Sequence, residues 1–279
     1  MTRMTPNSGN RFSDKVMRPE HLRAPLEAVM REAGEIARAT ARRTYRRWTK
    51  GHDNSPVSEA DIAVNDFLRP RLAELAPHAA WLSEETEDQP DRTVPFAWIV
   101  DPIDGTRAFI SGRADWAVAV ALVEDGVPQL AAIYAPVTDE MFVAARGQGA
   151  TWNGARIMAN AGDGLTGARL AGPKRYLARL SDLHPQIDAQ PKIHSLALRL
   201  TRVAQGGLDA AFASGSSHDW DLAAADLLVH EAGGVMTDFS GRGLVYNRAH
   251  VEHGPLIAAG RERHAALLAL VRDRMAEFA

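Results

Sequence analysis

The sequence predicts a mixed α/β fold in which two long helices precede an antiparallel sheet, and alternating strands and helices follow it. Three observations support this class. Apolar residues recur at helical spacing in the first part, the apolar period changes to two from Trp116, and short apolar runs alternate with helical segments from Ala168 onward. With 279 residues, 46% of them hydrophobic, the chain can form one large domain or two closely packed halves.

The first half, residues 21–160, is predicted to pair two helices with an antiparallel sheet. Residues 21–47 have the apolar spacing of one long amphipathic helix, and "SPVSEADIAVNDFLRPRLAEL" predicts a second, with Ser58 and Asp61 forming a capping box. The runs "WAVAVALV", "QLAAIYAP" and "EMFVAAR" read as strands, and "EDGVP" marks a hairpin.

The second half, residues 161–279, is predicted to be α/β. The segments expected to alternate are "ARLAG", "PKRYLARL", "SLALRLTRVAQGG", "LDAAFA", "WDLAAADLLVHEAGG", "GVMTDF", "PLIAAG" and a C-terminal helix from Arg261. The Gly-rich stretch "NAGDGLTG" is the expected boundary between the halves, and the polar residues 1–20 are expected to form a disordered tail.

Composition excludes several classes of function. The 32 basic and 35 acidic residues give a net charge of −3, so no overall field attracts nucleic acid or an anionic membrane. The absence of cysteine excludes disulfides, thiolate zinc sites and a cysteine nucleophile. Without a membrane-length apolar run or a signal-peptide core, a cytoplasmic protein with no stable membrane insertion is expected.

Three segments bring carboxylates to the ends of predicted elements. Glu84 and Glu85 end one apolar run, Asp101 and Asp104 end "FAWIVDPID", and Asp221 begins a helix. Singly, these are explained by an acidic loop, a turn and an N-cap. Together they would form the hard-oxygen site that suits Mg²⁺, and the Gly-Thr after Asp104 adds backbone and hydroxyl groups for a phosphate. Two such ions about 3.5–4 Å apart could assist an in-line displacement.

The chain resembles the inositol monophosphatase superfamily at four segments. "SPVSEAD", "WLSEET", "WIVDPIDGTRAF" and "WDLAAADLLVHEAGG" have the order and separation of that superfamily's motifs, and the resemblance extends from about Leu26 to the C-terminus. It implies a layered αβαβα sandwich and a Mg²⁺-dependent, often Li⁺-inhibited phosphomonoesterase that attacks a small phosphorylated metabolite with metal-activated water. A homodimer is a further expectation from the family. One departure is Ser83, where the acidic motif usually begins with Gly.

The resemblance also implies roles for individual residues. The implied ligands of two or three Mg²⁺ ions are Glu84, Asp101, the carbonyl of Ile103, Asp104 and Asp221. Gly105 and Thr106 are implied to hold the phosphate beside Asp104 and Asp221. Asp61 with Thr106 is implied to orient the attacking water, and Glu84 is counted with them as catalytic.

Within the superfamily, the sequence most resembles the bacterial 3′(2′),5′-bisphosphate nucleotidases, which convert phosphoadenosine phosphate to AMP. "DPIDGTRAF", "DWAVAVAL" and "LVYN" carry this resemblance. Ser214 stands where inositol-specific members have a Glu. Arg199 lies roughly where nucleotidases have a Lys that contacts substrate, and Ser195, on the same segment, is also expected to bind substrate. The alternatives are an inositol-1-monophosphatase or another sugar or histidinol phosphate phosphatase.

Three other patterns have weaker functional interpretations. "GDGLTG" matches a dinucleotide fingerprint, but a strand-like run follows it. Ser217, His218 and Asp219 are adjacent in sequence, which is a poor geometry for a catalytic triad. The basic run 41–50, expected to continue the first helix, defines a rival class, a nucleic-acid-binding module. We nevertheless expect no nucleic-acid partner.

Overall fold

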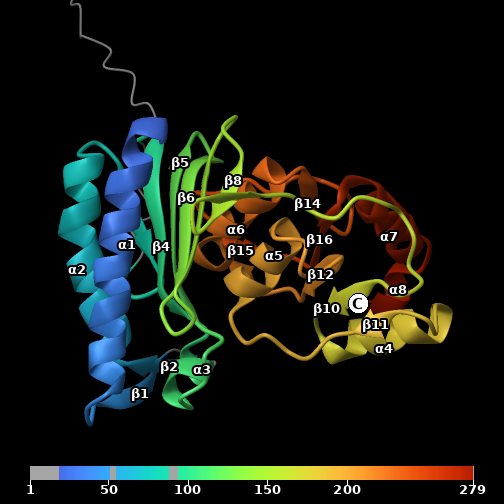
Figure 1. Ribbon diagram of the computed structural model, residues 1–279, viewed down its shortest axis with the longest axis horizontal. Coiled ribbons are helices and arrows are strands. Elements are labelled where there is room, and N and C mark those ends of the chain that lie inside the picture. The colour runs from blue at the N-terminus through green and yellow to red at the C-terminus, as the bar shows by residue number, and fades with distance from the viewer. Residues whose placement is uncertain (1–18, 51–54, 88–93, 279) are drawn as a thin grey trace, which may run out of the picture.

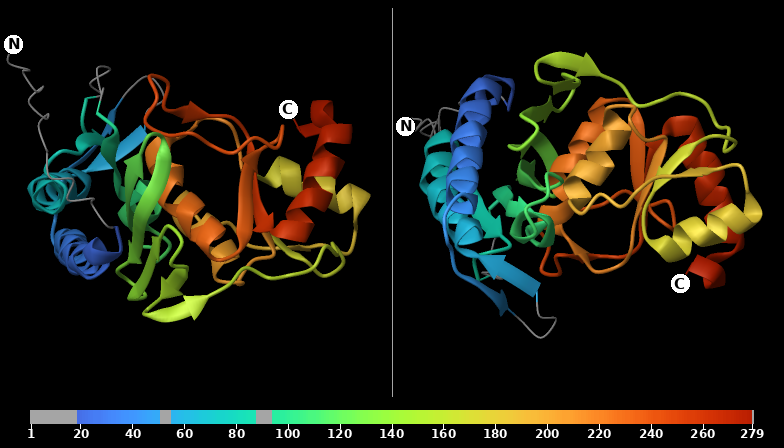
Figure 2. Two further views of the ribbon diagram at one scale, coloured as in Figure 1. Left: turned by 90° about the horizontal axis from the view of Figure 1, so that it is seen from above. Right: turned by 60° about the horizontal axis from the view of Figure 1, so that its bottom comes forward.

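A computed structural model describes residues 19–50, 55–87 and 94–278, and shows five layers (Figures 1 and 2). A helix pair, a seven-stranded sheet, a second helix pair, a five-stranded sheet and an outer group of helices follow one another across the molecule. The predicted layered αβαβα sandwich is confirmed.

The first half holds the outer helix pair and the larger sheet. Its elements are α1 (Pro19–Ala41), β1 (Arg47–Lys50), β2 (Ser55–Ser58), α2 (Glu59–Leu75), β3 (Ala80–Ser83), β4 (Phe96–Asp104), α3 (Thr106–Ile110), β5 (Ala117–Glu124), β6 (Val127–Ala135), β7 (Glu140–Ala145), β8 (Ala150–Trp152) and β9 (Ala155–Ile157). The large sheet has the order β3-β4-β5-β6-β7-β8-β9, with β3 parallel to β4 and the other pairs antiparallel.

The second half holds the inner helix pair, the smaller sheet and the outer helices. Its elements are β10 (Arg169–Ala171), α4 (Lys174–Leu183), β11 (Asp188–Ala189), α5 (Leu196–Ala204), β12 (Ala210–Ala213), β13 (Ser217–His218), α6 (Asp219–Glu231), β14 (Gly234–Asp238), β15 (Glu252–His253), β16 (Leu256–Gly260), α7 (Arg261–Asp273) and α8 (Met275–Phe278). The small sheet has the order β11-β10-β12-β16-β14.

Three apolar clusters fill the interfaces between layers, and one of them surrounds the inner helix pair on both sides. Alternate residues of the large sheet face opposite sides, so Trp98 and Val100 of β4 pack toward α1 and α2, while Ile99 packs toward α5 and α6. A third cluster, including Tyr176, Phe212 and Phe239, joins the small sheet to the outer helices. The inner helices α5 and α6 are therefore held between two sheets, which fixes the start of each helix relative to the strands.

One sequence prediction is wrong. The helix expected over residues 21–47 begins at Pro19 but ends at Ala41, and the basic run 41–50 is a turn followed by strand β1. The apolar helical spacing stops near Ala37, and Trp48 pairs instead with Val57 of β2. A basic helix over 41–50 therefore does not exist, because a pairing with the next segment overrides the local pattern.

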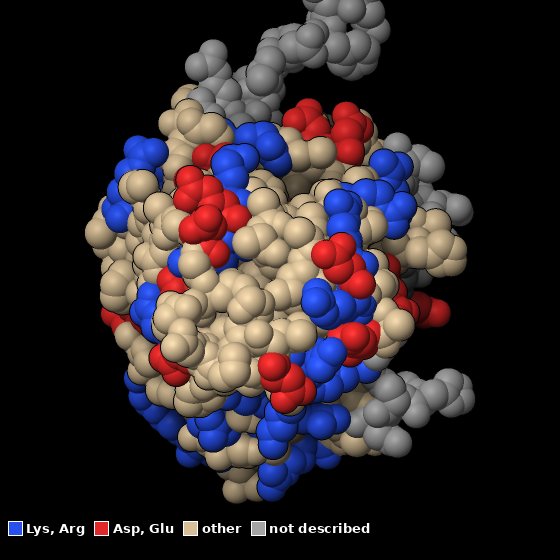
Figure 3. Space-filling view, turned by 90° about the vertical axis from the view of Figure 1, so that its right-hand side faces the viewer, with Lys and Arg blue, Asp and Glu red and all other residues tan. Residues whose placement is uncertain are grey.

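The other predicted elements of the described chain are present. Helix α2 has the predicted capping box between Ser58 and Asp61, and the hairpin at "EDGVP" joins β5 to β6. Most of the expected tail lies outside the described residues, and the boundary near 160–167 stays a prediction. No described helix has the length and apolar character needed to span a membrane. On the face formed by the outer helices, basic and acidic side chains lie next to one another (Figure 3).

Candidate active site

A bulge in strand β4 determines where Asp101 and Asp104 point. Asp101 pairs with Ala119 and Asp104 with Ala117, so three steps along β4 match two steps along β5. Residues three apart in a regular strand point to opposite faces, and the extra residue of the bulge brings both carboxylates to one face. Pro102 lies within the bulge, where its missing N–H breaks no regular ladder bond.

Helix α6 and strand β3 bring two further carboxylates to the same place. Asp221 is in the first turn of α6, where its carboxylate accepts a hydrogen bond of 2.6 Å from the backbone N–H of His218. Glu84 follows β3, and its backbone N–H donates to the carbonyl of Val100, one residue before Asp101. The parallel pairing of β3 with β4 thus places Glu84 beside Asp101.

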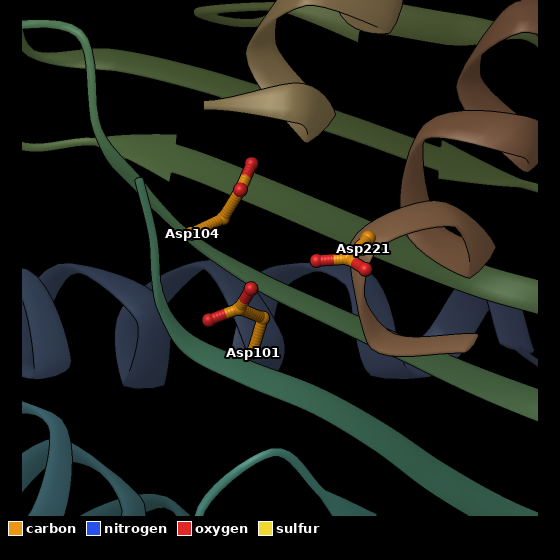
Figure 4. A group of neighbouring side chains, drawn as sticks. All are labelled: Asp101, Asp104 and Asp221. Atoms are coloured by element: carbon orange, nitrogen blue, oxygen red, sulfur yellow. The ribbon is translucent and has the colours of Figure 1, made fainter. Parts of the chain in front are cut away.

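The aspartates converge on one point. Oxygen atoms of Asp101, Asp104 and Asp221 all lie within 4.8 Å of one another, and Figure 4 shows Asp221 of α6 directed toward the two side chains of β4. Burial, reinforced by the charge of Asp221, raises the pKa of Asp104 to about 7. Burial, then the charges of Glu84 and Asp104, raise the pKa of Asp101 well above its usual range. Asp101 and Asp104 form no ion pair with a residue that the structure describes.

Asp61 and Thr106 form the second part of the site. The Thr106 hydroxyl lies 3.2 Å from Asp61 Oδ1 and 3.0 Å from the carbonyl oxygen of Ile103. Ser58 donates to Asp61 Oδ2 from both its hydroxyl, at 2.6 Å, and its backbone N–H, at 2.8 Å. Burial raises the pKa of Asp61 to about 6 despite these hydrogen bonds. Asp61 is thus fixed in place and titrates near neutral pH.

The start of α5 lies against Asp104. The Ser195 hydroxyl and the backbone N–H of Ala197 both donate to Asp104 Oδ2, and the N–H of Leu196 donates to Oδ1. An added Cβ at Gly105 would lie 3.1 Å from the Ser195 backbone nitrogen, and Gly105 has a φ of +90°, so a side chain here would be both crowded and strained. Glycine lets the chain after Asp104 pass close to α5.

Arg199 is placed near the aspartates but serves the backbone. Its guanidinium donates to the carbonyls of Ile193, at 3.0 Å, and Phe212, at 3.1 Å. It therefore ties the segment before α5 to strand β12. A contact between Arg199 and substrate stays a prediction, and so do the ligand and catalytic roles given above to the other site residues.

Sequence reasoning missed two residues of the site. Lys50, at the end of β1, lies 3.2 Å from Glu84 Oε1 and 2.6 Å from Glu85 Oε1, and donates to the Glu84 carbonyl. Burial raises the pKa of Glu84 to about 7 although Lys50 opposes the shift. His218 stacks on Trp220 with ring centroids 4.7 Å apart, just before Asp221. The sequence analysis considered His218 only with its neighbours Ser217 and Asp219, as an unsuitable catalytic triad.

The donor set fits Mg²⁺. The three clustered groups are carboxylates, the ligand type that Mg²⁺ prefers. Their negative charges repel one another, and a divalent cation would neutralise those charges. The cluster adjoins a carbonyl, that of Ile103, and the N-terminal N–H groups of α5. Such a site is typical of an enzyme that acts on phosphate esters.

Comparisons with known proteins agree with this chemistry. Residues 18–276 match the model of the inositol monophosphatase family. The putative Nus factor SuhB of Neisseria meningitidis serogroup B is 32% identical over 78% of this chain and 85% of its own. The 3′(2′),5′-bisphosphate nucleotidase CysQ of Aggregatibacter actinomycetemcomitans is 33% identical over 82% of this chain and 88% of its own.

Solved structures share the fold. The SuhB protein of Bartonella henselae superimposes with a TM-score of 0.79 at 28% identity, covering 89% of this chain and 97% of that one. An IMPase/NADP phosphatase, determined with Mg²⁺ and phosphate, gives a TM-score of 0.80 at 22% identity, covering 92% of this chain and 96% of its own. The chain belongs to the inositol monophosphatase family, and it is a Mg²⁺-dependent phosphatase.

Proposed function

We propose that this phosphatase is a 3′(2′),5′-bisphosphate nucleotidase that converts phosphoadenosine phosphate to AMP. The observation that carries the proposal is Ser214, an exposed neutral residue after β12 and seven positions before Asp221. A carboxylate there could accept hydrogen bonds from the hydroxyls of an inositol ring, which a serine does much more weakly. The likeness to the CysQ nucleotidase supports the same choice.

The proposed metal ligands are Glu84, Asp101, the Ile103 carbonyl, Asp104 and Asp221. Bound Mg²⁺ would stabilise the charge that develops on the phosphoryl oxygens. In our proposal the phosphate rests against Gly105 and Thr106, the N-terminal end of α3. The bulge in β4 already turns Asp101 and Asp104 to the same face, so we expect the strand to keep this conformation when metal and substrate bind.

Asp61 and Thr106 are proposed to orient the attacking water. When the Thr106 hydroxyl donates to Asp61, its lone pairs remain free to accept a hydrogen bond from water. The water oxygen then forms a bond to phosphorus as the ester P–O bond breaks, and the water proton passes through Thr106 to the Asp61 carboxylate. A pKa of about 6 suits Asp61 to hold that proton transiently near neutral pH.

A substrate panel tests the choice of substrate. We expect kcat/KM with Mg²⁺ to be higher for phosphoadenosine phosphate than for inositol-1-phosphate, fructose-1,6-bisphosphate or histidinol phosphate. Ser214→Glu should narrow the gap between the nucleotide and inositol-1-phosphate, whereas Ser214→Gln, of similar size without the charge, should narrow it less. A clear preference of the wild type for inositol-1-phosphate would contradict the proposal.

A second candidate has support from the comparisons, because SuhB relatives 30–32% identical to this chain are named Nus factors. Arg42, Arg43 and Arg47 lie exposed in or beside the 41–50 segment. A gel-shift measurement with RNA and DNA at moderate salt tests a nucleic-acid interface there, and we expect no specific complex. A complex that Arg42→Ala/Arg47→Ala abolishes, with phosphatase activity retained, would establish that second function.

A further inference from the structure

A cavity of about 630 Å³ lies between the loop that follows α3 and the segment that precedes α5. Its walls include Arg113 and Asp115 of the first loop, Lys192 and Ile193 of the second segment, and Arg202 of α5. This volume is within the range of small-molecule sites. None of these residues belongs to the set of metal ligands or catalytic residues proposed above.

The walls of the cavity are connected to the carboxylate cluster by hydrogen bonds. The Asp115 carbonyl accepts a hydrogen bond of 3.1 Å from the backbone N–H of Ser195, whose hydroxyl donates to Asp104. The same carbonyl lies 3.2 Å from an ideal Cβ at Gly105. His194 binds Asp115 through its backbone N–H, at 2.8 Å, and its ring Nδ1, at 2.7 Å. The two loops that line the cavity therefore meet beside the proposed phosphate site.

The cations of the cavity are not all neutralised. Arg202 is held at 2.6 Å by each of the two oxygens of Glu140, which leaves little free charge. Arg113 donates from Nε to Asp115 at 2.8 Å, and its two terminal nitrogens have no acceptor in the described chain. Lys192 is exposed and has no carboxylate partner among the residues that the structure describes. Within the described chain, the cavity thus presents the Lys192 ammonium, which has no carboxylate partner, and the two terminal nitrogens of Arg113, which have no acceptor.

Arg199 is a poor candidate for binding a second phosphate. Its guanidinium already donates to two backbone carbonyls, and removing it from them would leave buried acceptors unpaired. A nucleotide with two phosphates nevertheless needs a cation for the phosphate that does not react. The cavity supplies such cations within the loops that contact Gly105 and Ser195.

We propose that this cavity binds the non-reacting phosphate of the substrate, with Lys192 and the free nitrogens of Arg113 as its contacts. Arg199 is then a positioning residue that holds the Ile193 side of the cavity. The inference rests on the proposed function for the identity of the nucleotide. Its chemistry, a phosphate dianion bound by an ammonium and a guanidinium, applies to any substrate with a second phosphate.

The test compares two substrates that differ only in that phosphate, phosphoadenosine phosphate and 3′-AMP. We expect Lys192→Ala to lower the preference for the bisphosphate, measured as the ratio of the two kcat/KM values, by about tenfold, mainly through KM. Arg113→Ala should act in the same direction, Lys192→Arg should keep the preference, and Lys192→Glu should lower it further. The matched control is Lys174→Ala, an exposed lysine of α4 outside the cavity.

Two outcomes would overturn the inference. One is an unchanged ratio in both Lys192→Glu and Arg113→Ala, each shown to be folded by its melting temperature. The other is a fall in this ratio as large in the control Lys174→Ala as in Lys192→Ala, since the effect would then not belong to the cavity. If the substrate panel rejects the nucleotide, fructose-1,6-bisphosphate against fructose-1-phosphate gives the same ratio and tests the cavity independently.

Discussion

Two sets of buried carboxylates in this protein have opposite surroundings. The structural set is represented by Asp209, and the other set is the cluster of Asp101, Asp104 and Asp221. Asp209 accepts hydrogen bonds from Asn160, at 2.8 Å, and from the backbone and side chain of Arg169, at 2.8 and 3.1 Å, and these outweigh burial to lower its pKa. Among the described residues, Asp101 accepts a hydrogen bond from the N–H of Ile103 and otherwise faces other carboxylates. Asp209 thus has a cation of the protein beside it, whereas we propose that the cluster on β4 and α6 takes its cation from solution.

Lys50 is intermediate between these two cases. It gives Glu84 and Glu85 a cation, yet burial still keeps the pKa of Glu84 near 7. The ammonium of Lys50 pairs with Glu84 and Glu85, and among the described residues it forms no ion pair with Asp101 or Asp104. The difference between the two sets of carboxylates should therefore be visible in activity, in stability and in their dependence on Mg²⁺ and pH.

The largest expected effect is on turnover. Asp101→Asn or Asp104→Asn removes charge from a proposed ligand of the cation that faces the reacting phosphate, so kcat should fall by orders of magnitude while the fold survives. Asp209→Asn, the matched change in the structural set, should leave kcat of the folded enzyme within about twofold of wild type. Phosphate release with Mg²⁺ and with excess EDTA checks both. Full activity in EDTA would remove the metal from the mechanism.

The next effect concerns whether Asp61 and Thr106 act as a unit. We expect Thr106→Ala and Asp61→Asn each to lower kcat, by about 10²-fold, and the double variant to be little worse than either. Thr151→Ala, a threonine of β8 whose hydroxyl interacts with Arg23 and the Val143 carbonyl, is the control substitution. Strictly additive losses in the double variant would show that the two residues act independently.

Stability should change in opposite directions in the two sets. Asp209→Asn breaks an ion pair and weakens its hydrogen bonds, so it should lower the free energy of unfolding by about 1–3 kcal/mol. Asp101→Asn relieves repulsion among buried carboxylates and should raise the melting temperature in EDTA, by about 2–4 °C for each kcal/mol gained. Thermal unfolding of both variants in EDTA checks this. A destabilised Asp101→Asn protein would mean that neither the burial of this carboxylate nor its repulsion by Glu84 and Asp104 lowers the stability of the metal-free protein.

The smallest effect is on the pH dependence of stability. The folded-state pKa values of Asp104 and Glu84, about 7, lie above their unfolded values, so the metal-free protein binds extra protons and loses stability as pH rises through about 7. The increase in melting temperature on adding Mg²⁺ should consequently be larger at pH 8 than at pH 6. Asp104→Asn should flatten the dependence in EDTA, and an equal Mg²⁺ effect at both pH values would contradict the assignment.

Local sequence was sufficient for most of the fold. The capping box of Ser58 and Asp61 requires only residues three apart, and the hairpin at Asp125 and Gly126 requires only a two-residue turn, so both were predicted. The helix expected to run to Arg47 failed because strand β1 is formed by pairing with β2, which the helical period of the preceding residues cannot reveal. The helical spacing of apolar residues predicts the helix itself, but pairing with a partner strand can decide where that helix ends.

By itself, the sequence determined the composition of the site: the carboxylates of three motifs, the Gly-Thr after Asp104, and a neutral residue at Ser214. Tertiary structure decided how these groups face one another. The bulge turns Asp101 and Asp104 to the same side, and the start of α5 meets Asp104 across 91 residues of chain. The sequence could not predict either that Arg199 donates to backbone carbonyls or that Lys192 has no carboxylate partner in the described part of the chain. Hydrogen-bond partners and unpaired charges depend on distances between segments remote in sequence, and only the packing of the layers fixes those distances.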